Sequence, residues 1–135
     1  MILLDTHVLL WCSLQHGRLG SQARDQIRLA WRRDALAVSA ISFWEVACLR
    51  QQGRVLLARS TEAWRRDWLE QGLREVSIDG ALASAAAALE GLPQQLDLAR
   101  RCIVVTALHT GATLVTADPP VLAWSGELSR LDARV

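Results

Sequence analysis

The chain has 135 residues, a formal net charge of +1 and 51% hydrophobic residues. These values predict a single globular domain over residues 1–135, and the overall charge does not by itself indicate a nucleic-acid partner. No stretch is long and apolar enough to span a membrane, and Asp5 and His7 interrupt the first apolar run, which excludes an ordinary signal peptide. We therefore expect a cytoplasmic protein without a membrane partner.

Two features of the composition need separate explanations. The cysteines, Cys12, Cys48 and Cys102, lie in apolar helical patterns without paired spacing, so we interpret them as small buried side chains in a reducing cytoplasm. All 15 basic residues are arginine. Genome composition explains this bias most simply, and the alternative is a use of arginine for phosphate contacts, to which its planar guanidinium is suited.

The first predicted element is a short strand, residues 2–4, which is followed directly by Asp5 and then by an apolar helix. Its uninterrupted apolar residues are typical of a strand that is buried on both faces, as in a parallel sheet. A carboxylate directly after such a strand lies at the carboxyl edge of the sheet, where open α/β sheets bind their ligands. The alternative role of Asp5 is only to cap the N-terminus of the helix that follows.

The rest of the chain alternates between helices and strands. Apolar residues recur at helical spacing in five further segments, which begin near Ser21 (as an N-cap), Phe43, Ser60, Ala81 and Asp97. Short apolar runs predict three more strands, over residues 35–38, 75–78 and 113–117. The residues after Pro119 can add an edge strand. This alternation predicts an α/β fold: a single domain with a central, mostly parallel sheet that is flanked by helices.

The topology brings four acidic residues to one edge of this sheet. Asp5 and Asp118 each follow a strand directly, and Glu45 lies in the helix that begins just beyond the second strand. The helix that starts at Asp97 is joined to the last strand by a two-residue turn, so it runs antiparallel to that strand and its N-terminus lies at the same edge. Ser42, three residues before Glu45, has the spacing of a capping box, which is the structural alternative for Glu45.

Clustered carboxylates repel one another, raise one another's pKa values and destabilise a fold unless a cation is present. Oxygen ligands without histidine or cysteine favour a hard ion, Mg²⁺ or Mn²⁺. Such an ion can orient a water molecule and stabilise the charge that develops when a phosphodiester bond is cleaved. We therefore predict that the metal ligands and the catalytic residues are the same four acids: Asp5, Glu45, Asp97 and Asp118.

An aspartyl phosphatase is the alternative enzyme class, with Asp5 as the nucleophile. This chemistry usually needs a second acid two residues further on as acid and base, and that position is His7, which counts against it. The sequence has no Gly-x-Gly spacing that would indicate a nucleotide-binding loop. For His7, packing or capping is the structural interpretation, and contact with the substrate is the functional one.

Four segments carry a family pattern: MILLDTHVLLW at residues 1–11, ISFWEVA at 41–47, Gly53-Arg54, and LVTAD at 114–118. Together they resemble the PIN-domain ribonucleases, specifically the VapC toxins of bacterial toxin–antitoxin pairs. The resemblance implies a metal-dependent endoribonuclease that cleaves RNA, is frequently a homodimer and is neutralised by a small cognate antitoxin protein. It also implies that Asp5, Glu45 and Asp118 are acids of the metal site.

One motif departs from the family pattern. The family commonly has Asp-Pro-x-Asp-Arg before an apolar helix, and the corresponding residues here are Asp97-Leu98-Ala99-Arg100-Arg101. Because Arg100 occupies the position of an acid, the alternative function is a PIN-fold protein with weakened or lost catalysis that still binds RNA or an antitoxin. Arg100 faces the same way as Asp97 on its helix, and its long side chain can fold over the acids or extend into solvent. Folded over the acids, it would weaken metal binding.

Trp64 and Trp68 lie one turn apart on the helix that begins near Ser60. Surrounded by arginines and acids, they have the pattern of an apolar anchor that an antitoxin or a second copy of the chain would cover. The alternative is that both side chains pack inward against the core.

Overall fold

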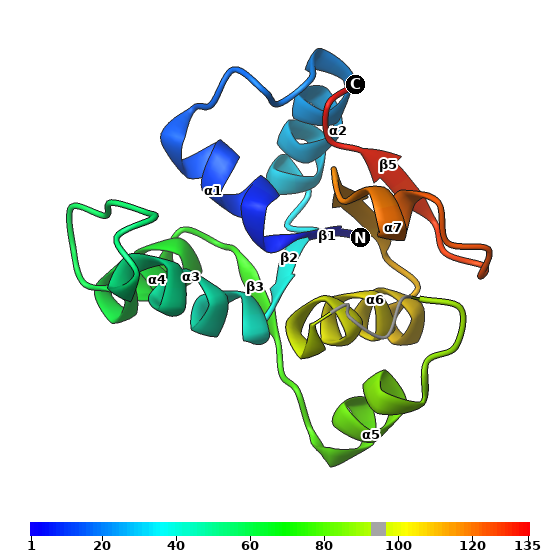
Figure 1. Cartoon of the computed structure of the whole chain (residues 1–135). Helices are drawn as coiled ribbons and strands as arrows, with labels where there is room; N and C mark the ends of the chain where they lie inside the picture. Colours follow the sequence, from blue (N-terminus) through cyan, green and yellow to red (C-terminus); the bar gives the residue numbers. More distant parts are fainter. Residues whose placement is uncertain (93–96) are drawn as a thin grey trace.

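The computed structural model describes residues 1–92 and 97–135. In these residues five short strands form one sheet, and helices cover both of its faces (Figure 1). The elements follow one another as β1 (Ile2–Leu4), α1 (Thr6–Leu14), α2 (Ser21–Arg32), β2 (Leu36–Ser39), α3 (Ile41–Gln51), α4 (Thr61–Glu70), β3 (Arg74–Val76), α5 (Gly80–Ala88), α6 (Leu98–Thr110), β4 (Thr113–Thr116), α7 (Pro119–Leu122) and β5 (Arg130–Asp132). None of the described helices is long and apolar enough to cross a membrane.

The sheet has the strand order β3-β2-β1-β4-β5, and every neighbouring pair is parallel. β1 lies in the centre, where Leu3 is level with Ala37 of β2 and with Leu114 of β4. The prediction of an α/β fold with a parallel sheet is confirmed, and β5 is the edge strand expected after Pro119. Parallel pairing also places the carboxyl ends of all five strands at one edge of the sheet.

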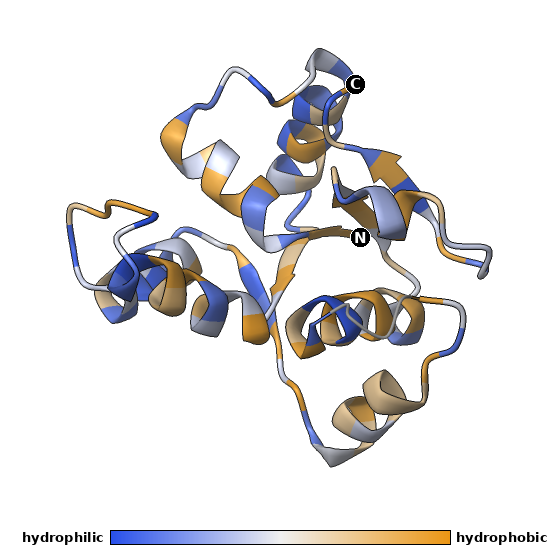
Figure 2. Cartoon of the chain, viewed as in Figure 1, coloured by the Kyte–Doolittle hydropathy of each residue, from blue (hydrophilic) through white to orange (hydrophobic). Residues whose placement is uncertain are grey.

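Successive residues of the strands point to opposite faces of the sheet and build separate cores. On one face, Leu4, Val38 and Val115 pack against α1, α2 and the tryptophans of α4. On the other face, Leu3 and Leu114 pack against α6 and α7, and α5 packs on the outer side of α6. Figure 2 shows hydrophobic residues along β1 and β2, at the centre of the sheet, and an alternation of hydrophobic and hydrophilic residues on α2. Burial on both faces explains why the three inner strands, β2, β1 and β4, are mostly apolar in sequence.

The helix starts follow the sequence signals only in part. Asp97 is the N-cap of α6 and accepts a hydrogen bond of 2.9 Å from the Arg100 amide. The predicted Ser21 cap is wrong, because Ser21 is the first helical residue of α2 and Gly20 is its N-cap. A Cβ atom at Gly20 would overlap the backbone of Val135, so the close approach of the C-terminal residues requires glycine here.

The capping box of Ser42 and Glu45, which was the structural alternative for Glu45, is not formed. α3 begins at Ile41 with Ala40 as its N-cap, so Ser42 lies inside the first turn. The hydroxyl of Ser39 accepts a hydrogen bond of 3.3 Å from the Ile41 amide instead. Glu45 is therefore not needed as a cap and is available for contacts at the edge of the sheet.

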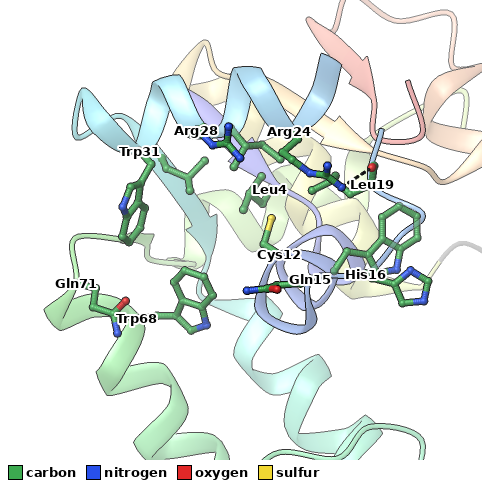
Figure 3. A pocket seen from close by; sticks show the side chains of 13 residues that line it. Leu4, Cys12, Gln15, His16, Leu19, Arg24, Arg28, Trp31, Trp68 and Gln71 are labelled. Carbon is green, nitrogen blue, oxygen red and sulfur yellow. Dashed lines mark hydrogen bonds between the residues drawn. The ribbon is translucent and has the colours of Figure 1, made fainter. Parts of the chain in front are cut away.

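Trp64 and Trp68 pack toward the face of the sheet that α1 and α2 cover. The indole nitrogen of Trp64 donates a hydrogen bond of 3.2 Å to the hydroxyl of Ser13, and its ring contacts Phe43 edge to face. Both tryptophans are half-buried, and Trp68 lines a groove of about 730 Å³ together with Trp31 (Figure 3). These contacts favour the inward-packing interpretation over an exposed anchor.

The three cysteines are free thiols, as expected from their spacing. Cys102 is buried, whereas Cys12 and Cys48 are half-buried. Burial raises the pKa of the Cys12 thiol to about 11, although Arg24 nearby lowers it. Cys12 therefore stays protonated at neutral pH and acts as a small apolar side chain of the groove.

Candidate active site

Asp5 lies directly after β1, at the carboxyl edge of the sheet, and is only 3% exposed. Its Oδ1 atom accepts a hydrogen bond of 2.8 Å from the Thr6 amide and so caps α1. Its Oδ2 atom accepts a hydrogen bond of 2.6 Å from the hydroxyl of Thr116, at the end of β4. Asp5 is thus both the helix cap and a member of the acid cluster, so the two interpretations of this residue are compatible.

Asp118 lies beside Asp5 because the hydroxyl of Thr116 forms hydrogen bonds with both residues. The hydroxyl of Thr116 accepts a hydrogen bond of 3.0 Å from the Asp118 amide. The Oδ2 atom of Asp118 is buried and receives no hydrogen bond from the described residues. Arg100 brings its Nε atom to 3.1 Å from this oxygen, so it supplies a charge without an aligned N–H group. A buried carboxylate oxygen without a donor is costly, and it indicates a place for a cation.

Glu45 reaches the same edge from α3. The hydroxyl of Thr6 donates a hydrogen bond of 2.5 Å to Glu45 Oε1 and shares another of 2.9 Å with the Ser42 hydroxyl. Because Thr6 follows Asp5 directly, this bond ties Glu45 to the start of α1. The long side chain of Glu45 is therefore held at the edge by the residue next to the first acid.

Asp97 and Arg100 come from the first turn of α6. The side chain of Asp97 is 56% exposed, and its Oδ2 atom lies 3.8 Å from Arg100 Nη1. The guanidinium of Arg100 thus lies between Asp97 and the buried Asp118. Of the two orientations that the sequence allowed, Arg100 adopts the one that folds over the acids.

The pKa values show that the acids of this edge act on one another. Burial raises the pKa of Glu45 against the lowering effect of the hydrogen bond from Thr6, and the charges of Asp5 and Asp97 raise it further. Burial also raises the pKa of Asp118, against the lowering effect of Arg100. The ionised cluster is therefore held in an unfavourable state that a further positive charge would relieve.

The donors at this edge fit a divalent cation in kind. All four predicted residues offer carboxylate oxygens, which suit a hard ion, and one buried oxygen of Asp118 lacks a hydrogen bond from residues 1–92 and 97–135. In the arrangement seen here, no group of three or more histidine, cysteine or acidic side chains among the described residues is close enough to hold an ion. Glu45 is bonded to Thr6, and Arg100 lies against Asp118. Of the four acids, Asp5 and Asp118 are the buried pair.

Sequence reasoning missed the two threonines that organise this edge. Thr6 directly follows Asp5, and Thr116 lies two residues before Asp118, so a hydroxyl next to each strand-end acid was the available signal. The remaining neighbour, His7, accepts a hydrogen bond of 3.0 Å from the Ala117 amide through Nε2. This bond links α1 to the end of β4 and supports the structural interpretation of His7.

The comparison with known families agrees with this geometry. A family model described as the PIN domain matches residues 2–120. The chain belongs to the PIN domain family. This PIN domain is 40% identical over 119 residues to Ribonuclease VapC22 of Mycobacterium tuberculosis (strain ATCC 25618 / H37Rv), and the match covers 87% of this chain and 86% of that relative. The resemblance found in the sequence motifs is therefore confirmed.

Solved structures share the fold of this PIN domain over nearly its whole length. A toxin–antitoxin complex from Klebsiella pneumoniae has 22% identity and a TM-score of 0.64, with 98% of each chain covered. The crystal structure of VapBC2 from Rickettsia felis, bound to a DNA fragment from its promoter, has 16% identity and a TM-score of 0.68, with 97% of this chain and 98% of that chain covered. At these identities the likeness concerns the fold alone.

Proposed function

We propose that this PIN-domain protein is an endoribonuclease that acts in the cytoplasm as the toxin of a toxin–antitoxin pair. Membership of the family and the 40% identity to a protein named as a ribonuclease support this activity. The observation that carries the proposal is the buried pair of Asp5 and Asp118, in which one oxygen of Asp118 has no hydrogen-bond donor among the residues that the structure describes. Structural neighbours that are toxin–antitoxin complexes support a cognate antitoxin as the partner.

In this proposal, Asp5 and Asp118 bind Mg²⁺ or Mn²⁺, and Glu45 and Asp97 contribute directly or through water. Such an ion, when bound, supplies a more acidic water and stabilises charge on the phosphodiester. Thr116 holds Asp5 in place, which is the role that outer-shell donors have for metal-binding carboxylates. All four acids are therefore proposed as both the metal-binding and the catalytic residues.

The decisive experiment compares cleavage of a single-stranded RNA by the wild type, by Asp5→Asn and by Asp25→Asn, each with Mg²⁺ or Mn²⁺ and again with EDTA. Asp25 is an exposed aspartate on α2, so its variant controls for the same chemical change outside the site. We expect EDTA and Asp5→Asn each to lower the rate by more than about a hundredfold. Equal rates for the two variants would show that the proposed site is wrong.

A second readout follows the metal without the reaction. Titration with Mn²⁺ should raise the melting temperature of the wild type with the logarithm of the metal concentration, and it should have little effect on Asp5→Asn. Ca²⁺ is expected to bind without supporting cleavage. The alternative aspartyl phosphatase is tested on the same preparations with a phosphomonoester in place of RNA, which we expect to remain intact.

A PIN-fold protein with weakened catalysis is the second candidate, and the contact of Arg100 with Asp118 favours it. The positive charge already placed on Asp118 competes with a metal ion for the same oxygen. Slow cleavage that rises at high Mn²⁺ concentration would support this candidate. A homodimer also remains a proposal, and light scattering of the purified protein measures its mass directly.

A further inference from the structure

The hydroxyl of Thr6 connects the start of α1 to two side chains of α3. Its Oγ1 atom lies 2.5 Å from Oε1 of Glu45 and 2.9 Å from the hydroxyl of Ser42. We infer that Thr6 is a positioning residue of the proposed reaction, which holds Glu45 where its carboxylate orients a water molecule and does not bind the metal ion directly. The inference rests on the proposed function and deepens it, because it gives the acids of one site different roles.

The Thr6 hydroxyl has a single proton, for which its two neighbours compete. A hydroxyl group donates one hydrogen bond, although it can accept two. The contact with Glu45 is the shorter one and is strengthened by the negative charge of the carboxylate, so the proton lies toward Glu45. Thr6 and Ser42 are only 4% and 0% exposed, so water does not compete for this bond. The carboxylate of Glu45 is therefore held firmly at Oε1.

The backbone and the side chain of Thr6 serve different acids. The Thr6 amide donates a hydrogen bond of 2.8 Å to Oδ1 of Asp5, whereas the hydroxyl contacts Ser42 and Glu45. These two residues of α3 are three positions apart, so their side chains reach Thr6 from one face of the helix. A change of the Thr6 side chain therefore alters the position of Glu45 and leaves the cap at Asp5 in place.

Glu45 is held apart from the buried pair of Asp5 and Asp118. In the part of the chain that the structure describes, no three acidic, histidine or cysteine side chains are close enough together to hold one ion. Oε1 of Glu45 is occupied by Thr6, and its Oε2 has no hydrogen-bond donor within residues 1–92 and 97–135. Oε2 is thus left to accept a hydrogen bond from a water molecule. Burial raises the pKa of Glu45 despite the bond from Thr6, which makes the carboxylate a better proton acceptor.

The first test separates metal binding from turnover with Thr6→Val, which keeps the backbone amide and the shape of the side chain. With Mn²⁺ alone, the melting temperature of Thr6→Val should rise as that of the wild type does, whereas Asp5→Asn should show little rise. In cleavage of a single-stranded RNA at saturating Mn²⁺, Thr6→Val should lower kcat by roughly 10–100-fold and change KM little. Glu45→Gln, which leaves Thr6 unchanged, should give the same two results.

Thr6→Ser and Thr106→Val are the matched controls. Thr6→Ser keeps the hydroxyl and should restore kcat to near the wild-type value. Thr106 is also buried, and its hydroxyl donates a hydrogen bond of 2.7 Å to the Cys102 carbonyl within α6. Thr106→Val makes the same chemical change without removing a bond to an acid, so its kcat should equal that of the wild type.

A double-variant experiment in EDTA shows whether Thr6 acts through Glu45. The losses in melting temperature of Thr6→Val and Glu45→Ala should be less than additive in the combined variant, because both changes remove the same bond. This readout needs neither a metal ion nor cleavage. Additive losses would overturn the inference.

Three results of the first test would also overturn it: an unchanged kcat in Thr6→Val, an equal loss of kcat in Thr106→Val, or loss of the Mn²⁺-induced rise in Thr6→Val and Glu45→Gln. The last result would make Glu45 a direct metal ligand. Failure of the wild type to cleave RNA would contradict the endoribonuclease, and the inference about turnover with it. The experiment in EDTA would then decide by itself whether Thr6 holds Glu45.

Discussion

The two buried acids of the carboxyl edge are held in different ways. Both oxygens of Asp5 accept short hydrogen bonds, of 2.8 Å from the Thr6 amide and 2.6 Å from the Thr116 hydroxyl. Asp118 has one buried oxygen that receives no hydrogen bond from the described residues and that faces Arg100 at 3.1 Å. Neutral donors built into the fold orient the first acid, whereas the half-exposed guanidinium of Arg100 stabilises the second. The Asp5 half of the proposed site is preorganised, and in the proposed function a metal ion replaces the guanidinium at the Asp118 half.

The largest expected effect comes from removing the Thr116 hydroxyl, which holds Asp5 in place. Thr116→Val keeps the shape of the side chain and removes the hydroxyl that serves both acids. We expect a loss of about 1–3 kcal/mol in the free energy of unfolding, because Asp5 Oδ2 loses its donor, and a loss of roughly 10–100-fold in metal affinity. Urea unfolding measures the loss of stability, and Mn²⁺ titration measures the loss of metal affinity. Thr113→Val, which removes an exposed bond to Ser129 on the same strand, is the control, and an equal effect there would contradict the special role of Thr116.

The next largest effect comes from replacing Arg100, whose guanidinium lies against Asp118. Arg100→Asp replaces the guanidinium near Asp118 with a carboxylate, so metal ions no longer compete with a positive charge. At 40% exposure of the Arg100 side chain the contact is worth about 1 kcal/mol, which corresponds to roughly five- to tenfold tighter Mn²⁺ binding. Cleavage of RNA should also be faster. If this variant binds metal no better and cleaves no faster than the wild type, the contact with Asp118 does not limit the site.

A smaller effect tests the same contact in the absence of metal. Arg100→Met keeps a long side chain but leaves Asp118 without its counter-charge. In EDTA we expect the free energy of unfolding to fall by about 0.5–1 kcal/mol, since the contact is partly exposed to solvent. Addition of Mn²⁺ should restore the stability, because the ion takes over the role of the guanidinium. Unchanged stability in EDTA would show that Asp118 does not depend on Arg100.

The smallest effect concerns the ion pair of Arg65 and Glu75, in which, unlike Asp118, the carboxylate accepts hydrogen bonds at both oxygens. Arg65 donates two hydrogen bonds, of 2.6 and 2.8 Å, to Glu75, and these bonds lower the pKa of Glu75 below its ordinary value of 4.5. A lowered pKa in the folded state stabilises the protein above the ordinary pKa, and this contribution is lost as the pH falls through the folded value.

Glu75→Gln should therefore be less stable than the wild type by about 0.3–1 kcal/mol at pH 7, and the difference should be smaller at a pH well below 4.5, where Glu75 becomes protonated in the folded state. Urea unfolding at the two pH values measures the difference. A difference that persists in acid would assign the loss to packing and not to the charge of Glu75. The variant lies outside the acid cluster, so its RNA cleavage should match that of the wild type.

The sequence alone determined the order of the elements and the edge at which the acids meet. Apolar runs and helical spacing are local patterns, and the parallel pairing that they imply brings the strand ends of Asp5 and Asp118 together. The position of Asp97 at this edge was predicted from the short turn before β4, which requires α6 to run antiparallel to that strand. The third strand was placed approximately, at 75–78 instead of Arg74–Val76, since its edge position leaves a weaker apolar pattern.

The tertiary structure alone decided which groups satisfy the acids. Thr116 reaches Asp5 across 111 positions of sequence, and Gly20 replaces Ser21 as a cap because the distant Val135 passes over it. The side chain of Arg100 had two directions open to it, and the buried oxygen of Asp118 selected one. Such contacts depend on the register of neighbouring strands and on the rotamers that packing leaves free, and neither is encoded in the spacing of residues along one element.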